Sequence, residues 1–234
     1  AKRNLDEHTY AAHSLAEART IVVSGEVAVL VDPEGASARE LRPAILVDAI
    51  LAKRNLGTTM DMAPVVIGVG PGFTVGENVH CIVETNRGHN LGRVLYSGSA
   101  EPDTGIPGDI VGMTTERVLR APQTGIFLSR HDIGDHVKAG DVVATVEANG
   151  VSKEIRTVIS GVIRGLLRSG TPVTDRIKVG DVDPRDNTAC HHVSDKAFAI
   201  GGGILEAILG RFNRPCYIRR GILHCPVDKN VPTA

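Results

Sequence analysis

The sequence is poor in aromatic residues and carries almost no net charge. It contains no Trp, 3 Tyr and 4 Phe, and its 26 Lys plus Arg are balanced by 27 Asp plus Glu. Few aromatic rings leave little surface on which unpaired bases could stack, and a balanced charge offers no basic excess for a phosphate backbone. We therefore expect a protein that does not bind nucleic acid and whose core consists of aliphatic residues and glycine.

Two further absences concern the cellular compartment. No apolar run approaches the roughly 18 residues that cross a bilayer, and residues 1–13 lack the apolar stretch of a secretory signal. No two of the four cysteines form a C-x-x-C motif; they are Cys81, Cys190, Cys216 and Cys225. These features predict a cytoplasmic protein with free thiols and no membrane contact.

The first half of the chain has the pattern of an α/β domain. Residues 13–20 show helical spacing, and residues 26–31 and 44–47 are almost continuously apolar, as are parallel strands that are covered on both faces. A short helix is expected between these two strands, and residues 65–69 predict a third strand. The order of elements predicts a partial Rossmann-like domain over residues 1–96.

The carboxyl ends of these strands form the candidate site. Ligands of open parallel sheets bind beyond such ends, where Asp32, Asp48 and the loop 70–76 are expected to meet. Backbone amides of a glycine-rich loop can hold a phosphate, and neighbouring cations can add contacts, although a tight turn and solvated surface charges explain the same residues. The candidate cofactor-binding residues are Gly70, Gly72, Thr74, Lys53, Arg54, Arg87 and His89.

The second half of the chain contains a duplicated sequence pattern. Residues 97–116 are rich in Gly, Pro and Asp and are predicted to be a linker. After it, residues 125–142 and 161–182 each show a short strand, a turn containing Gly and a second strand. This duplication is typical of the barrel-sandwich hybrid of lipoyl and biotinyl carrier domains, so residues 117–209 predict such a β domain with a terminal helix.

The hairpin between the two copies bears on function. Carrier domains of this type present a lysine for modification at the tip of that hairpin, but this sequence has Asn149-Gly150 there, and Lys153 follows three residues later. A structural or docking role is therefore favoured over a swinging-arm carrier.

The segment from Cys190 onward offers one more candidate and one more element. Cys190 is the weak catalytic candidate, because the imidazoles of His191 and His192 would favour its thiolate, while an inert, partly buried thiol is the alternative. No metal site is predicted, since the remaining cysteines lack metal-ligand spacing. Ser194 is predicted to cap a helix that the glycines 201–203 interrupt and that packs against the sandwich. The tail 210–234 stays unassigned.

Several long motifs resemble one family, the YqeB family of maturation proteins for selenium-dependent molybdenum hydroxylases. The likeness covers about residues 13–209. Family members usually carry a glycine-rich G-A-G-D-L-A-T-G segment near their start, which this sequence lacks. The motifs are LVDPEG (30–35), VDAILAKRN (47–55), PVVIGVGPGFTVGENVH (64–80), ETNRGHNLGRV (84–94), TGIPG (104–108), ERVLRAP (116–122), KVGDVDPR (178–185) and SDKAFAIGGGILEAIL (194–209).

The resemblance implies an accessory protein rather than a stand-alone enzyme. It implies action on the molybdenum cofactor (molybdopterin) or on a molybdenum hydroxylase client, with a phosphorylated small ligand as a further partner; self-association stays open. The runner-up is an enzyme that binds a nucleotide or S-adenosylmethionine through the G-x-G-P-G loop, and a carrier or adaptor module is a third reading.

Overall fold

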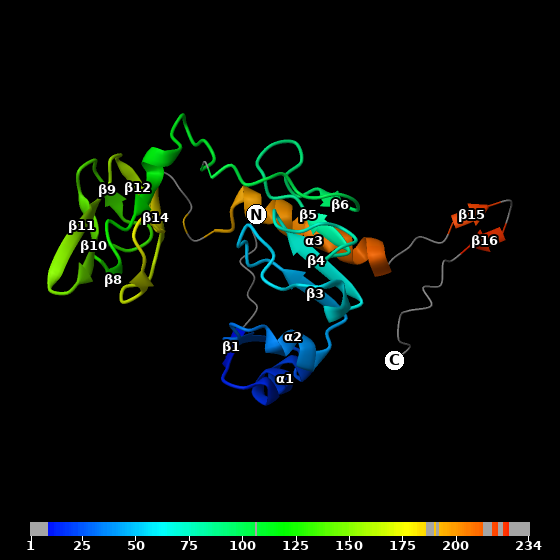
Figure 1. Ribbon diagram of the computed structural model, residues 1–234. Coiled ribbons are helices and arrows are strands. Elements are labelled where there is room, and N and C mark those ends of the chain that lie inside the picture. Colours follow the sequence, from blue (N-terminus) through cyan, green and yellow to red (C-terminus); the bar gives the residue numbers. More distant parts are fainter. Residues whose placement is uncertain are drawn as a thin grey trace. The chain divides into compact units, whose positions relative to one another are not determined.

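The chain divides into two compact units in the computed structural model. The first unit combines residues 1–103 with residues 193–234, and the second comprises residues 104–192. The division after residue 103 falls inside the predicted linker. The structure describes residues 9–105, 107–185, 190, 192–212, 217–219 and 222–224. Figure 1 shows the elements along the chain.

A four-stranded sheet forms the centre of the first unit. Its order is β3-β4-β5-β6, with β3, β4 and β5 parallel and β6 antiparallel to β5. Every residue of β4 is buried, as its apolar run predicts. The strands are β3 (Ile45–Asp48), β4 (Val65–Val69), β5 (Cys81–Val83) and β6 (Val94–Leu95), and the 3-10 turn η1 (Met60–Met62) precedes β4.

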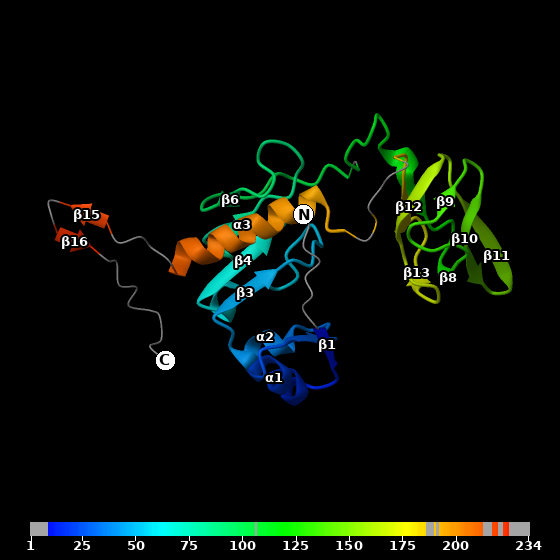
Figure 2. The same cartoon turned by 180° about the vertical axis from the view of Figure 1, so that it is seen from behind.

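Apolar side chains cover this sheet on both faces. Ile200, Ile204 and Ile208 of helix α3 (Asp195–Phe212) pack on one face, and Figure 2 shows α3 crossing the sheet there. The other face packs against loop residues that include Phe73 and Val79. Both faces of the sheet are therefore covered, which leaves its ends and its two edge strands, β3 and β6, for other contacts.

The N-terminal elements form a separate ribbon, which corrects one prediction. Strand β2 (Val27–Leu30) pairs in parallel with β1 (Thr9–Ala12) and not with β3. Helix α1 (Leu15–Val23) packs on this ribbon, and α2 (Ala36–Leu41) follows it. The prediction that β2 is covered on both faces is wrong, because Val27 and Val29 are 45% and 54% exposed.

The same correction extends to Asp32. Because β2 belongs to another sheet, Asp32 does not share a sheet edge with Asp48. Its carboxylate accepts hydrogen bonds from the amides of Ala36 and Ser37 instead. Asp32 therefore caps the short helix α2 rather than contributing to a ligand site. An apolar run identifies a strand, but it does not identify the neighbours of that strand.

The second unit is a sandwich of two four-stranded sheets, as the duplication predicts. One sheet has the order β11-β10-β8-β13 and the other β7-β14-β12-β9. Phe127, Val143, Val146, Ile163 and Val182 are fully buried between them. The strands are β7 (Val118–Arg120), β8 (Gly125–Ser129), β9 (His136–Val137), β10 (Val142–Ala148), β11 (Val151–Arg156), β12 (Gly161–Leu166), β13 (Pro172–Val173) and β14 (Lys178–Asp183), preceded by η2 (Thr115–Arg117).

The last helix departs from its prediction in two ways. Helix α3 runs without a break through the glycines 201–203, and it belongs to the first unit rather than to the sandwich. A short pair of strands, β15 (Tyr217–Arg219) and β16 (Ile222–His224), follows it in the tail that the sequence left unassigned. The predicted α/β chain with a lipoyl-like domain is confirmed, while the finer Rossmann-like assignment stays a prediction.

Two glycines explain why α3 lies where it does. A Cβ on Gly203 would stand 2.1 Å from the carbonyl oxygen of Gly92, and a Cβ on Gly92 would stand 2.4 Å from that of Ala199. The helix backbone therefore touches the backbone of the loop after β5 directly. Helix propensity disfavours glycine, but this contact requires it.

We expect Gly203→Ala to destabilise the protein by about 2–3 kcal/mol, because the added methyl group would push α3 away from the loop. Gly201→Ala is the matched control in the same helix, since a Cβ there meets no atom within 4 Å. That substitution is expected to stabilise the helix by roughly 0.5–1 kcal/mol. Urea unfolding of the three proteins checks both signs, and equal behaviour of the two variants would contradict the packing argument.

Candidate functional site

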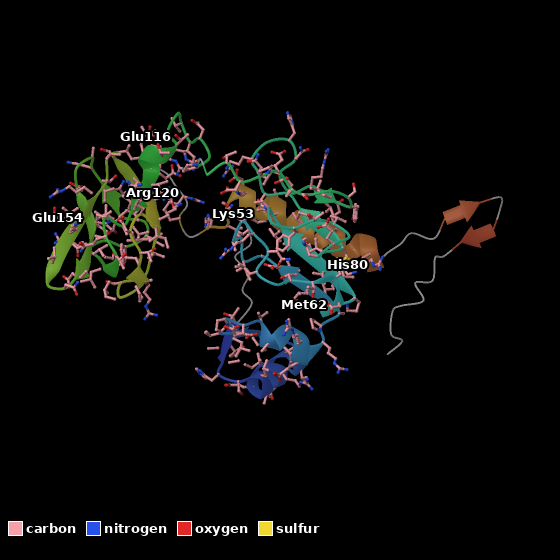
Figure 3. The ribbon with its side chains drawn as sticks, viewed as in Figure 1. Lys53, Met62, His80, Glu116, Arg120 and Glu154 are labelled. Atoms are coloured by element: carbon pink, nitrogen blue, oxygen red, sulfur yellow. The ribbon has the colours of Figure 1, made fainter. Side chains whose placement is uncertain are left out.

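The candidate site lies at the end of the sheet where its parallel strands finish. Strands β3, β4 and β5 lead into the loops 49–55, 70–76 and 84–92, and the start of α3 lies against the last of these; we call these four segments the polar edge. Figure 3 shows Lys53 at this end of the sheet and His80, which precedes β5, at the other. Parallel strands thus bring together three of the segments that the sequence singled out.

Most backbone amides of the glycine-rich loop 70–76 are not available for the predicted anion-binding nest. The amide of Gly70 donates to the carbonyl of Val83, and those of Val75 and Gly76 donate to the carbonyls of Gly98 and Val79, each at 2.9 Å. The amide of Thr74 donates to Asn78 Oδ1 at 2.9 Å. Because these four donors are satisfied within the protein, Gly70 and Thr74 lose their predicted role of binding an anion through the backbone.

The glycines serve close packing instead. At Gly72, where φ is 109°, a Cβ would stand 2.6 Å from the Cα of Arg54, so the backbone of the loop after β3 lies directly on this glycine. In that loop Leu51 and Lys53 adopt left-handed conformations, with φ of 60° and 64°. Side chains other than glycine rarely accept such angles without support from their surroundings. Gly72 therefore helps to fix the loop that carries Lys53.

Two predicted cations take part in ion pairs at the polar edge. Lys53 Nζ lies 3.5 Å from Asp103 Oδ1, and Arg87 Nη1 lies 2.9 Å from Asp195 Oδ2 in the first turn of α3. The Arg87 hydrogen bond lowers the pKa of Asp195 below its usual range. All four side chains are well exposed, so these pairs contribute little to stability.

A third cation, Lys196, lies close enough to both Lys53 and Arg87 for their charges to act on it, and the sequence analysis missed it. Its side chain is partly buried, and it has no ion pair with any residue that the structure describes. Burial lowers the pKa of Lys196, and the nearby charges of Lys53 and Arg87 lower it further, against the opposite effect of Asp103 and Glu84. Three positive side chains from three segments thus crowd together.

The position of Lys196 follows from the helix cap. The Ser194 side chain accepts a hydrogen bond from the amide of Ala197 at 3.1 Å, which confirms the predicted cap. Because Ser194 starts the helix beside Arg87, the second residue of that helix faces the polar edge. The motif Ser194-Asp195-Lys196 was visible in the sequence, but its neighbour Arg87, 108 residues away, was not.

A buried carboxylate sets the shape of the loop that carries Arg87. Glu84 is 2% exposed, and its side chain accepts hydrogen bonds from the amides of Thr85, Asn86 and Glu101 at 2.6, 2.7 and 2.8 Å. The Glu101 carboxylate in turn accepts from the side-chain amides of Asn86 and Asn90, and these hydrogen bonds lower the pKa of Glu101. This network holds the loop 84–92 in one conformation.

The remaining predicted residues are not drawn into the cluster. Arg54 and His89 are exposed, and neither side chain makes an ion pair within the described part of the chain. Cys190 is partly buried, with its Sγ 3.6 Å from the carbonyl oxygen of Ile163. His191, Cys216 and Cys225 lie outside the described residues, so thiol chemistry at Cys190 stays a prediction. Among the described residues no group of three or more His, Cys, Asp or Glu side chains could hold a metal ion.

The hairpin of the sandwich has no lysine at its tip. Asn149 and Gly150 form the turn between β10 and β11, with φ of 50° and 77°. Lys153 is paired with Val146 in the strand register and is therefore part of β11. The Asn-Gly pair suits a two-residue hairpin whose central residues both have positive φ. The turn residues thus occupy the position where a carrier domain presents its lysine.

Comparison with known proteins supports two of these assignments. A family model described as "Biotin-requiring enzyme" matches residues 117–182. The "Uncharacterized protein YqeB" of Escherichia coli (strain K12) is 52% identical over 199 residues, which are 85% of this chain and 36% of that protein. The chain thus spans about a third of the length of this curated relative. The identity supports the YqeB family as the one that the sequence motifs resemble.

Solved structures share only a limited likeness with the chain. An aspartoacylase family protein from Mesorhizobium loti aligns at 26% identity and a TM-score of 0.28, covering 38% of this chain and 32% of its own. Urea carboxylase from Kluyveromyces lactis aligns at 25% identity and a TM-score of 0.28, covering 38% of this chain and 8% of its own. TM-scores this low support no functional inference. Within the described residues, no helix has the length and apolarity of a membrane span.

We expect Lys196→Met to raise the melting temperature at neutral pH, because it removes a desolvated ammonium that two other cations repel. The lowered pKa of Lys196 gives the sign of the pH effect. At pH values between the pKa of Lys196 in the folded protein and its ordinary value of 10.5, Lys196 is protonated in the unfolded chain but largely neutral in the folded protein. The free energy of unfolding of the wild type should therefore increase as the pH rises through this range, and the Lys196→Met variant should not show this increase.

Thermal unfolding from about pH 7 to pH 10 measures this effect. Lys153→Met is the matched control, since Lys153 is exposed in β11 and belongs to the other unit. A large loss of stability in Lys196→Met would show that Lys196 has a structural role instead.

Proposed function

We propose that this chain is part of an accessory protein for the maturation or activation of selenium-dependent molybdenum hydroxylases. It would act on the molybdenum cofactor as cargo or on the client enzyme itself. The support is the identity with YqeB of Escherichia coli together with the motifs that resemble that family. Since the chain spans 36% of that relative, the activity and partners of the whole protein belong to the same proposal.

The observation that carries the proposal is the hairpin tip of the sandwich. A lipoyl-type or biotinyl-type domain takes part in catalysis by carrying a group on a lysine, but the turn here consists of Asn149 and Gly150. The sandwich keeps the fold without that acceptor, which favours a structural or docking role over a carrier role. A protein that acts by recognition fits the role of a helper better than that of a carrier.

The first unit supports the same role from another direction. Its polar edge carries converging cations. The hydroxyl–carboxylate hydrogen bond next to it, from Thr58 Oγ1 to Asp48 Oδ2, is buried. Four amides of the glycine loop, those of Gly70, Thr74, Val75 and Gly76, are paired within the protein, which weakens the case for the nucleotide-dependent or S-adenosylmethionine-dependent enzyme. Binding and delivery of an anionic cofactor suits this arrangement.

Deletion of the gene in its native host is the direct test. We expect the molybdenum hydroxylase purified from the deletion strain to contain less molybdenum and to be less active, because cofactor loading would fail. Complementation with the full-length protein should restore both, and the protein should co-purify with the enzyme. Molybdenum and selenium analysis of the client gives the readout, and normal contents in the deletion strain would contradict the proposal.

The Lys153→Arg variant distinguishes a recognition role of the sandwich from a role as a carrier of a covalently attached group. We expect the variant to complement the deletion as well as the wild type does, and the native protein to show its unmodified mass, because Lys153 lies within β11 and not at the tip. Intact-mass spectrometry of protein from native cells checks this prediction. A lysine adduct that disappears in the variant, together with loss of complementation, would establish a carrier.

A further inference from the structure

We propose that Lys53, Arg87 and Lys196 form a binding site for the phosphate group of a small phosphorylated molecule at the polar edge. The site is inferred from these side chains alone, so it goes beyond the maturation role and does not depend on it. No residue of the site belongs to the sandwich, and each comes from a different segment of the first unit.

The strongest indication is the environment of Lys196. This side chain is partly buried and has no ion pair within the described residues, and the repulsion from Lys53 and Arg87 acts on it more strongly than the attraction from Asp103 and Glu84. A desolvated cation beside two like charges is unfavourable unless an anion is present. An anion placed among the three would compensate all of them, and it would also meet the first turn of α3, whose dipole favours negative charge.

The two existing ion pairs do not block such a ligand. Asp103 and Asp195, the partners of Lys53 and Arg87, are 43% and 74% exposed at their side chains. Exposed pairs of this kind are weak and exchange readily with solvent, whereas hydrogen bonds from Arg and Lys to a phosphate dianion are among the stronger polar contacts. The aspartates act as temporary counter-ions that a phosphate can replace.

The surrounding charges limit the size of the ligand. Asp103, Asp195 and Glu101 flank the cations, and the whole chain has a formal net charge of −1. A nucleic acid would bring further phosphates against these carboxylates, whereas one terminal phosphate would not. The preorganised loops also favour a compact group: Gly72 supports the loop of Lys53, and Glu84 fixes the loop of Arg87. The geometry therefore suits a phosphate monoester.

Isothermal titration with inorganic phosphate at constant low ionic strength tests the site on the intact chain. We expect a dissociation constant of about 1 mM or lower for the wild type. Lys196→Met and Arg87→Gln should each weaken binding by roughly tenfold, since each removes one charge-assisted contact. Asp195→Asn should tighten it by releasing Arg87, and the control Lys153→Met should leave it unchanged. Lys53→Gln, at an exposed side chain, provides a second loss-of-charge variant whose folding is not at risk.

The outcomes are separable. Tighter binding of an alkyl phosphate monoester than of inorganic phosphate would support a phosphorylated small molecule as the ligand. Equal affinity of the wild type and the Lys196→Met, Arg87→Gln and Lys53→Gln variants, or no binding below about 10 mM, would overturn the site. The phosphate titration and the metal analysis of the client enzyme test different proposals. Absence of phosphate binding would not change the result for the maturation role, and a client with normal molybdenum content would not change the result for the phosphate site.

Discussion

Direct contact between backbones at a few glycines is the constraint on which the first unit depends. The carbonyl of Gly92 touches α3 at Gly203, and the backbone of Arg54 rests on Gly72. A third contact places the ring of Phe73 against Gly68, since a Cβ there would lie 2.6 Å from that ring. These contacts bring a helix and two loops within reach of the same sheet end. The cations of the polar edge converge because glycine lets the helix and the loops behind them pack closely.

Much of the fold was predictable because it depends on local patterns. The apolar runs placed β3 and β4 within one residue, and the duplicated sequence pattern predicted a sandwich that the family model also matches at residues 117–182. The neighbours of β2 were not predictable, because an apolar run is the same whether a strand joins a ribbon or a larger sheet. The break predicted at the glycines 201–203 was wrong for a related reason. Propensity describes an isolated helix, whereas Gly203 is selected by its contact with another segment.

Two of the three cations of the candidate site were predictable from the sequence. Lys53 and Arg87 follow strand ends in the sequence, and parallel topology brought them to one edge as expected. In the glycine loop between them, the amides of Gly70 and Thr74 donate within the protein, and no sequence pattern tells whether an amide donates to a ligand or to the carbonyl of Val83. Lys196 could not be found because it reaches the site only through the long-range placement of α3. Residues positioned by non-local packing are the ones that sequence reasoning tends to miss.

The buried carboxylate of Glu84 affects how much conformational entropy the proposed site would lose when it binds an anion. Its three amide partners hold the loop of Arg87 in shape through contacts within the protein alone. An incoming molecule therefore meets a rigid surface and loses little conformational entropy in ordering it. Exchange then reduces to the replacement of one anion by another at the tips of two side chains, which involves no rearrangement of the chain. Under the proposed function, such a surface would take up and release a small anionic cargo without a conformational change of the loop.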